Sequence, residues 1–345
     1  VRRCVDIADL LATSTTHRLD AALVSLNSTG FDTSVVERLA SNGVRVGTVE
    51  SDGGHLGLGG PVRLGELGAW LAETADPVVG ATEAESGKVV AVWGPTGAPG
   101  RTSLAISLAT AAAAANLSTA IVDADVNGGA VGQWLGILDD VSGLMAACRD
   151  VTRGTQVSVE RHLLSLDDRT NVLTGVPRPD MWHNPRPGAI EGVLQQISTS
   201  HELVVVDCAF SAEASAGPTA GQITRRILEV SDEVVVVGRV DPIGLARLVR
   251  CIEDLGPWPR APRLVLNSFR ASLGWSEAEV SSTITELTGI VPWAFLPFDG
   301  PSHDLALMRG QPLRQVAPSS GYVARVERLV AGLGFSRQVD RAVSR

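Results

Sequence analysis

The sequence predicts an α/β protein, with a mostly parallel sheet covered by helices on both faces and a smaller α/β domain in front of it. Apolar, β-rich runs alternate with segments of helical pattern along nearly the whole chain, which is typical of parallel sheets. Two of these runs, 203–206 and 234–237, consist of apolar residues only. Such runs are expected for central strands that helices cover on each side.

Length and composition limit the class of protein. The chain has 345 residues, enough for two domains, and no apolar run approaches the roughly 20 residues of a membrane span. There is no secretory signal pattern, and the four cysteines, Cys4, Cys148, Cys208 and Cys251, form no metal or disulfide motif. A net charge of −9 argues against strong nucleic-acid binding. We therefore expect a cytoplasmic protein with reduced cysteines.

Residues 1–76 show a small α/β pattern, with helices expected at 5–12, 33–40 and 64–73 and strands at 21–26 and 44–49. The run 20–27 resembles a strand of response-regulator receiver domains, in which the phosphate-accepting Asp would fall on Asn27. An amide cannot form an acyl phosphate, so the resemblance implies a pseudo-receiver used for contacts. Because the chain begins at Val1, we expect its first strand and helix to be missing. A small α/β cap of other ancestry is the alternative.

Residues 77–87 contain Pro, Gly and acidic residues without periodicity and are predicted to be a linker. Residues 88–335 are predicted to form the second domain. Its expected strands are 88–93, 119–124, 171–176, 202–208, 233–237, 263–267 and 291–296. Its expected helices include 104–115, one at 188–197 with Pro187 in its first turn, one opened by Asp241 and ending near residue 255, and one near 323–333. The tail 336–345 has too few large apolar residues for a membrane anchor.

A glycine-rich loop, WGPTGAPGRTS at 93–103, lies between an expected strand and an expected helix, as a phosphate-binding loop requires. Gly97 and Gly100 permit the backbone angles and the close approach to an anion that such a loop needs. Arg101 supplies a cation, and Thr102 supplies a hydroxyl for a phosphate-bound Mg²⁺. For the loop alone, a glycine-proline turn without a ligand is the alternative.

Acidic residues end two further strands. Asp123 and Asp125 follow one strand, and Asp207 ends another. Ligands of such sheets bind beyond the carboxyl ends of the strands. Asp207 fits a metal role through bound water, and the other two fit metal hydration and orientation of an attacking water. Any single Asp is more simply a solvated turn residue, but the combination favours nucleotide binding.

Residues 88 to about 333 resemble the MinD/ParA group of deviant P-loop ATPases, and the CpaE/TadZ-like proteins in particular. The phosphate loop of this group, G-K-G-G-x-G-K-[ST], matches residues 95–102. Its paired aspartates match Asp123 and Asp125, its Walker B acid matches Asp207, and its base-flanking residues match Asn267 and Pro297.

The resemblance implies a P-loop fold, ATP and Mg²⁺ as cofactors, and a homodimer. The nucleotide-binding residues it implies are Gly97, Ala98, Pro99, Gly100, Arg101, Thr102, Ser103, Asn267 and Pro297. It implies metal binding by Thr102, Asp123 and Asp207, and catalysis by Asp125 and Arg101.

Five loop positions set this chain apart from the group. Its signature lysine falls on Thr96, its second lysine is Arg101, and Pro95 and Pro99 each lack an N–H donor. Ala98 replaces a glycine and is expected to need a negative φ. Weak or absent ATP hydrolysis follows from these departures.

The resemblance implies an organiser of the CpaE/TadZ type that localises Tad/Flp pilus assembly, recruited by partner proteins to the inner membrane face or the cell pole. A MinD/ParA-like role in septum placement or chromosome partitioning and a nucleotide-free scaffold are the alternatives. Outside the motifs, Arg247 and Arg250 are expected on a solvated helix face, Trp182 and His183 on a surface loop, and Asp304 as a helix cap.

Overall fold

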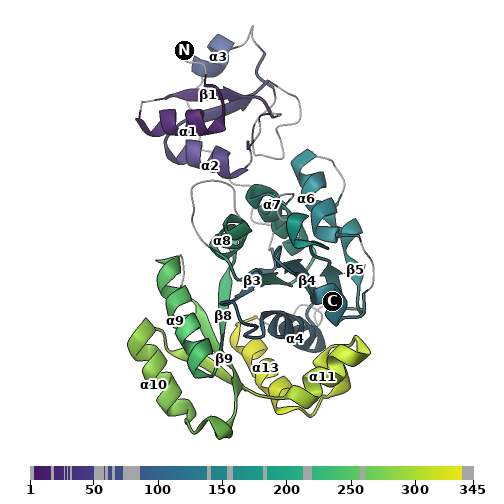
Figure 1. The fold of residues 1–345 in the computed structure, drawn as a ribbon. Coiled ribbons are helices and arrows are strands. Elements are labelled where there is room, and N and C mark those ends of the chain that lie inside the picture. Colours follow the sequence, from purple (N-terminus) through teal and green to yellow (C-terminus); the bar gives the residue numbers. More distant parts are fainter. Residues whose placement is uncertain are drawn as a thin grey trace, which may run out of the picture.

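Among the described residues, eight strands form one sheet in the order β10-β9-β8-β3-β7-β4-β6-β5 (Figure 1). The computed structural model describes residues 4–16, 19–26, 28, 30–31, 33–49, 58, 61–63, 67–72, 86–137, 141–153, 158–181, 185–212, 220–256 and 261–335. The strands are β3 (Lys88–Trp93), β4 (Thr119–Ala124), β5 (Leu164–Ser165), β6 (Thr170–Leu173), β7 (Leu203–Cys208), β8 (Glu233–Arg239), β9 (Arg263–Phe269) and β10 (Pro292–Pro297). All neighbouring strands are parallel except β5 and β6. The predicted α/β class is confirmed.

The predicted strands are all present. The bounds of β3 and β4 are those predicted, because both strands are apolar runs with clear ends. The sequence pattern does not predict β5, which has two residues and pairs antiparallel at the edge of the sheet. A strand this short carries no readable alternation.

Side chains alternate between the two faces of the sheet and form two core layers. In β3, Ala91 and Trp93 belong to one layer, and Val90 and Val92 belong to the other. The first layer is covered by α6 (Gly143–Arg153), α7 (Pro187–Ser198), α8 (Ala220–Val230), α9 (Pro242–Leu255) and α10 (Glu277–Thr288). The second is covered by α4 (Arg101–Ala114), α5 (Val131–Trp134), α11 (Gly300–Arg309), α12 (Leu313–Val316) and α13 (Gly321–Gly332).

Helix α4 is buried on nearly all sides, from Ser103 to Ala113. It packs against α13, β4 and β7, and its many alanines allow this close approach. The helix begins at Arg101, three residues before the predicted start at 104, so the cation and hydroxyl of the loop motif lie in its first turn.

Helix starts follow the expected chemistry, with one exception. Pro187 opens α7, and Asp241 caps α9 through a hydrogen bond of 2.8 Å from the Gly244 N–H. The predicted cap Asp304 is wrong, because Asp304 lies inside α11. Asp299 caps that helix and accepts a hydrogen bond of 3.3 Å from the Ser302 N–H.

The N-terminal part contains α1 (Ile7–Thr16), β1 (Ala21–Val24), α2 (Thr33–Ser41), β2 (Arg45–Thr48) and α3 (Leu67–Ala72). Strands β1 and β2 are parallel and share a small core with α1 and α2 (Figure 1). Asn27 and residues 73–85 lie outside the described residues, so the pseudo-receiver and the linker stay predictions.

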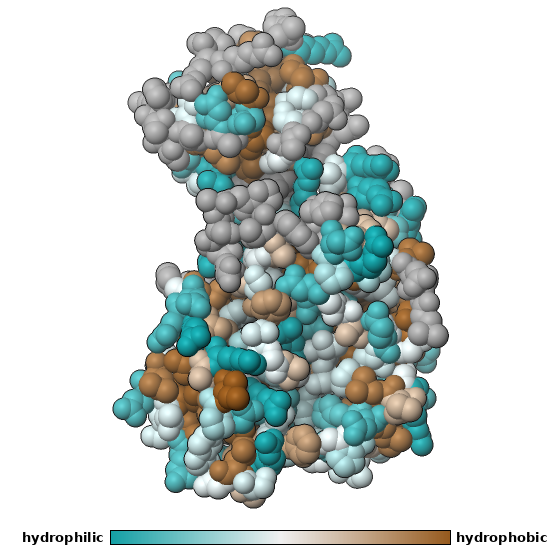
Figure 2. Space-filling view, in the orientation of Figure 1, coloured by the Kyte–Doolittle hydropathy of each residue, from teal (hydrophilic) through white to brown (hydrophobic). Residues whose placement is uncertain are grey.

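Hydrophobic residues are scattered in small groups over the face shown in Figure 2, with several near α9 and α10. Exposed examples are Ile243, Leu287, Phe298 and Met308. Within the described segments, none of the helices has the length and apolar character that crossing a membrane requires.

Candidate functional site: a phosphate loop between acidic and basic strand ends

The glycine-rich loop joins the end of β3 to the start of α4, at the carboxyl edge of the sheet. Gly94 passes close to β8, and a Cβ on it would lie 2.2 Å from the Val237 carbonyl oxygen. Gly97 and Gly100 both have a φ of 101°, a backbone conformation that only glycine adopts readily. The loop is therefore shaped by three glycines, two for conformation and one for space.

Ala98 has a φ of 52°. The expectation of a negative φ at this position is therefore wrong. The left-handed region is open to L-residues at a cost of about 1–2 kcal/mol. The loop thus keeps the turn that glycine would favour and holds an alanine in it under strain.

Asn267 holds the loop in place by hydrogen bonding. Its side-chain amide Nδ2 donates a hydrogen bond of 2.8 Å to the Pro99 carbonyl oxygen, and the Ser268 N–H donates to its Oδ1 at 2.7 Å. A Cβ on Gly100 would lie 2.3 Å from the same Nδ2. Asn267 thus positions the loop, and its contact with a base stays a prediction. Pro297, the other predicted base neighbour, ends β10 beside Phe269 of β9.

The acids lie at the carboxyl ends of two adjacent strands, β4 and β7, on one side of the loop. Asp123 and Asp207 are directly opposite each other in the register of β4 and β7. The Thr102 hydroxyl donates a hydrogen bond of 2.6 Å to Asp207 Oδ2, whereas the buried Oδ1 of the same carboxylate has no hydrogen-bond partner. Burial raises the pKa of Asp207 to about 7, although the Thr102 hydrogen bond and the charge of Arg101 oppose the rise.

Asp123 is enclosed by backbone. Its carboxylate accepts hydrogen bonds from the N–H groups of Asp125 at 3.2 Å and Val131 at 3.1 Å. A Cβ on Gly129 or on Gly175 would lie 2.6 Å from an atom of this carboxylate. Burial, with the nearby charge of Asp207, raises the pKa of Asp123 well above its ordinary value. This carboxylate holds the segment after β4 in place.

Arg101 turns back over its own loop. Its Nη1 donates to the carbonyl oxygens of Gly94 at 3.1 Å and Pro95 at 2.9 Å, and its Nη2 forms an ion pair of 3.2 Å with Asp125 Oδ2. The two predicted catalytic residues therefore contact each other. In this arrangement the positive charge of Arg101 is shared with a carboxylate and two carbonyl groups.

These residues fit ATP and Mg²⁺. Mg²⁺ binds few protein ligands and keeps several waters and phosphate oxygens. The Thr102 hydroxyl and the unpaired oxygen of Asp207 are ligands of the kind it prefers, and Thr102 follows a loop shaped to bind an anion. In the described part of the chain, no group of three or more His, Cys, Asp or Glu side chains could hold a metal alone.

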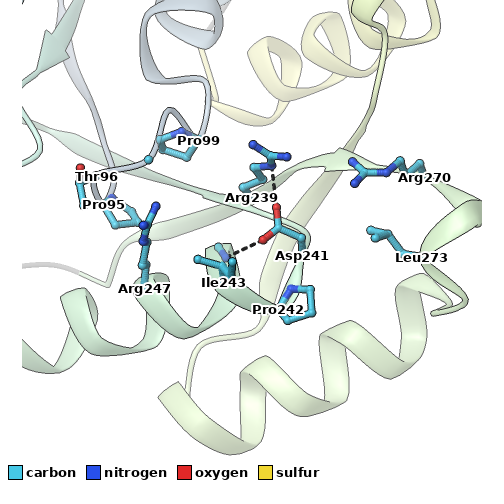
Figure 3. A pocket seen from close by; sticks show the side chains of 12 residues that line it. Pro95, Thr96, Pro99, Arg239, Asp241, Pro242, Ile243, Arg247, Arg270 and Leu273 are labelled. Atoms are coloured by element: carbon cyan, nitrogen blue, oxygen red, sulfur yellow. Dashed lines mark hydrogen bonds and ion pairs between the residues drawn. The ribbon is translucent and has the colours of Figure 1, made fainter.

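A cavity of about 620 Å³ lies on the other side of the loop (Figure 3). It is lined by the loop residues Pro95, Thr96, Gly97 and Pro99 and by residues at or after the ends of β8 and β9, among them Arg239, Asp241, Arg247 and Arg270. Arg247 is exposed on α9, as expected, and it also lines this cavity. Arg239 and Arg270 lie two and three residues beyond the predicted strands 233–237 and 263–267, and this position could have indicated them from the sequence.

Two other predicted positions, Trp182 and His183, lie outside the described residues.

The site has acids on the β4 and β7 side of the loop and arginines on the β8 and β9 side. A volume of several hundred Å³ is that of small-molecule sites.

Comparisons with known proteins agree with this fold. No family model matches the chain. The chromosome partitioning protein ParA of Myxococcus xanthus is 25% identical over 207 residues, which are 58% of this chain and 70% of that protein.

Solved structures are similar as well. A ParA family ATPase from Chlorobium tepidum matches with a TM-score of 0.62 and 16% identity over 72% of this chain and 99% of its own. The septum site-determining protein MinD of Pyrococcus horikoshii, solved with Mg-ADP, matches with a TM-score of 0.55 and 16% identity over 71% and 95% of the two chains. The eight-stranded sheet and the helices around it therefore have the fold of the MinD and ParA P-loop ATPases.

Proposed function

We propose that this protein binds ATP with Mg²⁺ at the carboxyl edge of the sheet and acts as a nucleotide-dependent spatial organiser. The observation that carries the proposal is the pairing of the loop with the acid of β7. The Thr102 hydroxyl lies 2.6 Å from Asp207, whose other oxygen is buried without a hydrogen-bond partner. Buried polar atoms are rarely left unpaired, so this atom favours a ligand beside it.

Each part of the site has a role in this proposal. The N–H groups of the loop and the start of α4 bind the phosphates, and Thr102 and Asp207 hold the metal, the latter through water. Asp125 orients water, and Asn267 and Pro297 flank the base. Mg²⁺ supplies charge that neutralises the phosphates.

Hydrolysis is expected to be slow or absent. Arg101 is engaged with Asp125 and with two carbonyl groups of its own loop, so it is poorly placed to stabilise charge on a leaving phosphate. The signature lysine of the MinD/ParA group falls on Thr96, which is exposed and has no charge.

The finer role that we propose is that of a CpaE/TadZ-type protein that localises Tad/Flp pilus assembly. The small N-terminal α/β unit supports this reading as a docking surface for partner proteins. A homodimer across the nucleotide is part of the proposal, and the exposed apolar side chains of Ile243 and Phe298 at the same edge suit a surface that a second copy covers. The protein would be cytoplasmic and recruited to the membrane or the cell pole by its partners.

A ParA-like role in partitioning is the second candidate, because the ParA of Myxococcus xanthus matches over more than half of this chain. Binding assays of the ATP-loaded protein with duplex DNA and with anionic vesicles separate the two roles. ATP-dependent binding to DNA would favour partitioning, and binding to vesicles would favour a MinD-like role. The pilus role predicts binding to neither.

The first test is calorimetric titration of the purified protein with ATP, with and without Mg²⁺, for wild type, Thr102→Ala and Thr110→Ala. Thr110 lies in the same helix and bonds only the helix backbone, so it is the matched control. We expect Mg²⁺ to tighten binding about tenfold or more in wild type and in Thr110→Ala, and not in Thr102→Ala, because a hydroxyl ligand is lost. No binding in wild type would indicate a nucleotide-free scaffold.

A further inference from the structure

The cavity beside the loop carries an excess of positive charge in an acidic chain. Three arginines, Arg239, Arg247 and Arg270, and one carboxylate, Asp241, line it, whereas the net charge of the chain is −9. Asp241 forms an ion pair of 2.6 Å with Arg239 and also caps α9. The single carboxylate is therefore already engaged, and the cavity favours an anion.

Of the three cavity arginines, Arg247 is the one with no hydrogen bond, ion pair or ring contact to another described residue. Arg270 lies over the Phe298 ring, 5.6 Å from its centroid. No hydrogen bond or ion pair joins Arg247 to another residue within the described ranges, and its side chain is exposed on the cavity side. Figure 3 shows it reaching from α9 toward Pro95 and Thr96 of the loop.

The guanidinium of Arg247 lies against the middle of the loop. A Cβ on Gly97 would lie 2.1 Å from Arg247 Nη1, so the charged group contacts the loop backbone at the residue whose φ is 101°. Helix α9 holds it there, because Asp241 caps the helix and Leu248 and Ile252 are buried in the core. The backbone position of Arg247 is thus set by a helix packed on the sheet.

Within the described part of the chain, the loop itself offers no other unengaged cation near this point. Arg101 is bound to Asp125 and to the carbonyl groups of Gly94 and Pro95, and Thr96 is uncharged. An arginine forms two parallel hydrogen bonds with a phosphate and keeps its charge at any working pH. A polyphosphate on the loop would therefore meet Arg247 as its accessible cation.

We propose that Arg247 is a phosphate-contacting residue, which binds the polyphosphate of a nucleotide held by the loop and supplies the charge that Arg101 shares with Asp125. This inference rests on the proposed nucleotide binding.

The test is calorimetric binding of ATP and of inorganic tripolyphosphate to wild type, Arg247→Ala, Arg247→Lys and Arg250→Ala, at two salt concentrations. Arg250 is an exposed arginine of the same helix that does not line the cavity, so it controls for net charge and helix content. We expect Arg247→Ala to weaken both ligands by about tenfold or more and to reduce the salt dependence of binding, with partial rescue by Arg247→Lys. Thermal unfolding establishes that each variant is folded.

Equal affinity of Arg247→Ala and Arg250→Ala for both ligands, with wild type binding ATP, would overturn the role of Arg247 and leave the nucleotide proposal standing. If wild type binds tripolyphosphate but not ATP, and Arg247→Ala loses the tripolyphosphate, Arg247 binds an anion and the proposed nucleotide binding is overturned. Binding of neither ligand by wild type would overturn both.

Discussion

Asp207 shows how one residue links stability to ligand binding. Its carboxylate is fully buried, is bonded by Thr102 on one oxygen and is unpaired on the other. Burial raises its pKa to about 7, so the folded protein holds a proton that the unfolded chain releases near the ordinary value of 3.8. Stability therefore falls as pH rises between these two values, because the unfolded state binds fewer protons there. Ionisation of this buried carboxyl group therefore lowers the stability of the folded protein, and a cation bound beside it would offset that cost.

We expect Asp207→Asn to be more stable than wild type at pH 8 and to flatten the fall in stability between about pH 4 and pH 7. An amide can still accept the hydrogen bond from Thr102 and carries no buried charge. The measurement is the midpoint of thermal unfolding as a function of pH, with the exposed Asp168→Asn as control. Each kcal/mol corresponds to roughly 2–4 °C for a domain of this size.

The same variant should lose Mg²⁺-dependent stabilisation by ATP. A variant that is less stable than wild type at pH 8, or that keeps the full effect of Mg²⁺, would contradict this account of Asp207.

At the scale of elements, the loop is held between two strands and a helix. Gly94 passes against the backbone of β8, Asn267 at the end of β9 bonds the Pro99 carbonyl, and Arg101 in the first turn of α4 closes over the loop. The contacts come from parts of the chain that are 168 residues apart in the case of Asn267 and Pro99. The loop conformation therefore depends on correct pairing of β3 with β8.

We expect Gly94→Ala to destabilise the protein by about 2–4 kcal/mol, whereas Gly128→Ala should change the free energy of unfolding by less than about 1 kcal/mol. The Cβ on Gly94 would lie 2.2 Å from the Val237 carbonyl oxygen, but Gly128 has no atom within 4 Å of the added group. Chemical denaturation of the two variants compares them directly. Similar stabilities would show that β3 and β8 can separate at this point without loss.

At the scale of the whole molecule, the eight-stranded sheet has two complete core layers of its own. One layer lies under α6 to α10 and the other under α4 and α11 to α13, and all the described members of both layers come after residue 88. The N-terminal unit has a separate small core. Helix α2 of this unit contacts α7 of the larger unit.

A fragment of residues 86–335 should therefore fold by itself. We expect it to unfold in one cooperative transition within about 5 °C of the corresponding transition of the full chain, and to bind ATP with the same affinity within a factor of about three. Thermal unfolding and calorimetry of the fragment check this. An aggregated or unfolded fragment would mean that the N-terminal unit completes the core rather than docks partners.

Much of the fold could be predicted from local patterns. β3 and β4 are apolar runs long enough to be buried on both faces, and the start of α7 follows from Pro187. The phosphate loop and the acids after β4 and β7 could be recognised because parallel strands bring their carboxyl ends to one edge. In contrast, β5 is too short to show a period. The prediction of Asp304 as the cap of α11 is wrong because the helix begins earlier, at Gly300, where Asp299 caps it.

The sequence alone determined the class, the order of the strands along the chain and the residue types at the edge of the sheet, because these depend on local periodicity and on motif spacing. Only the tertiary structure decided how those residues use their charge. Arg101 bonds Asp125 and its own loop, and Arg247 reaches Gly97 from another helix. Such contacts depend on the spatial order of strands β8, β3, β7 and β4 and on the rotation of α9 about its axis. Neither quantity is set by the residues next to each arginine.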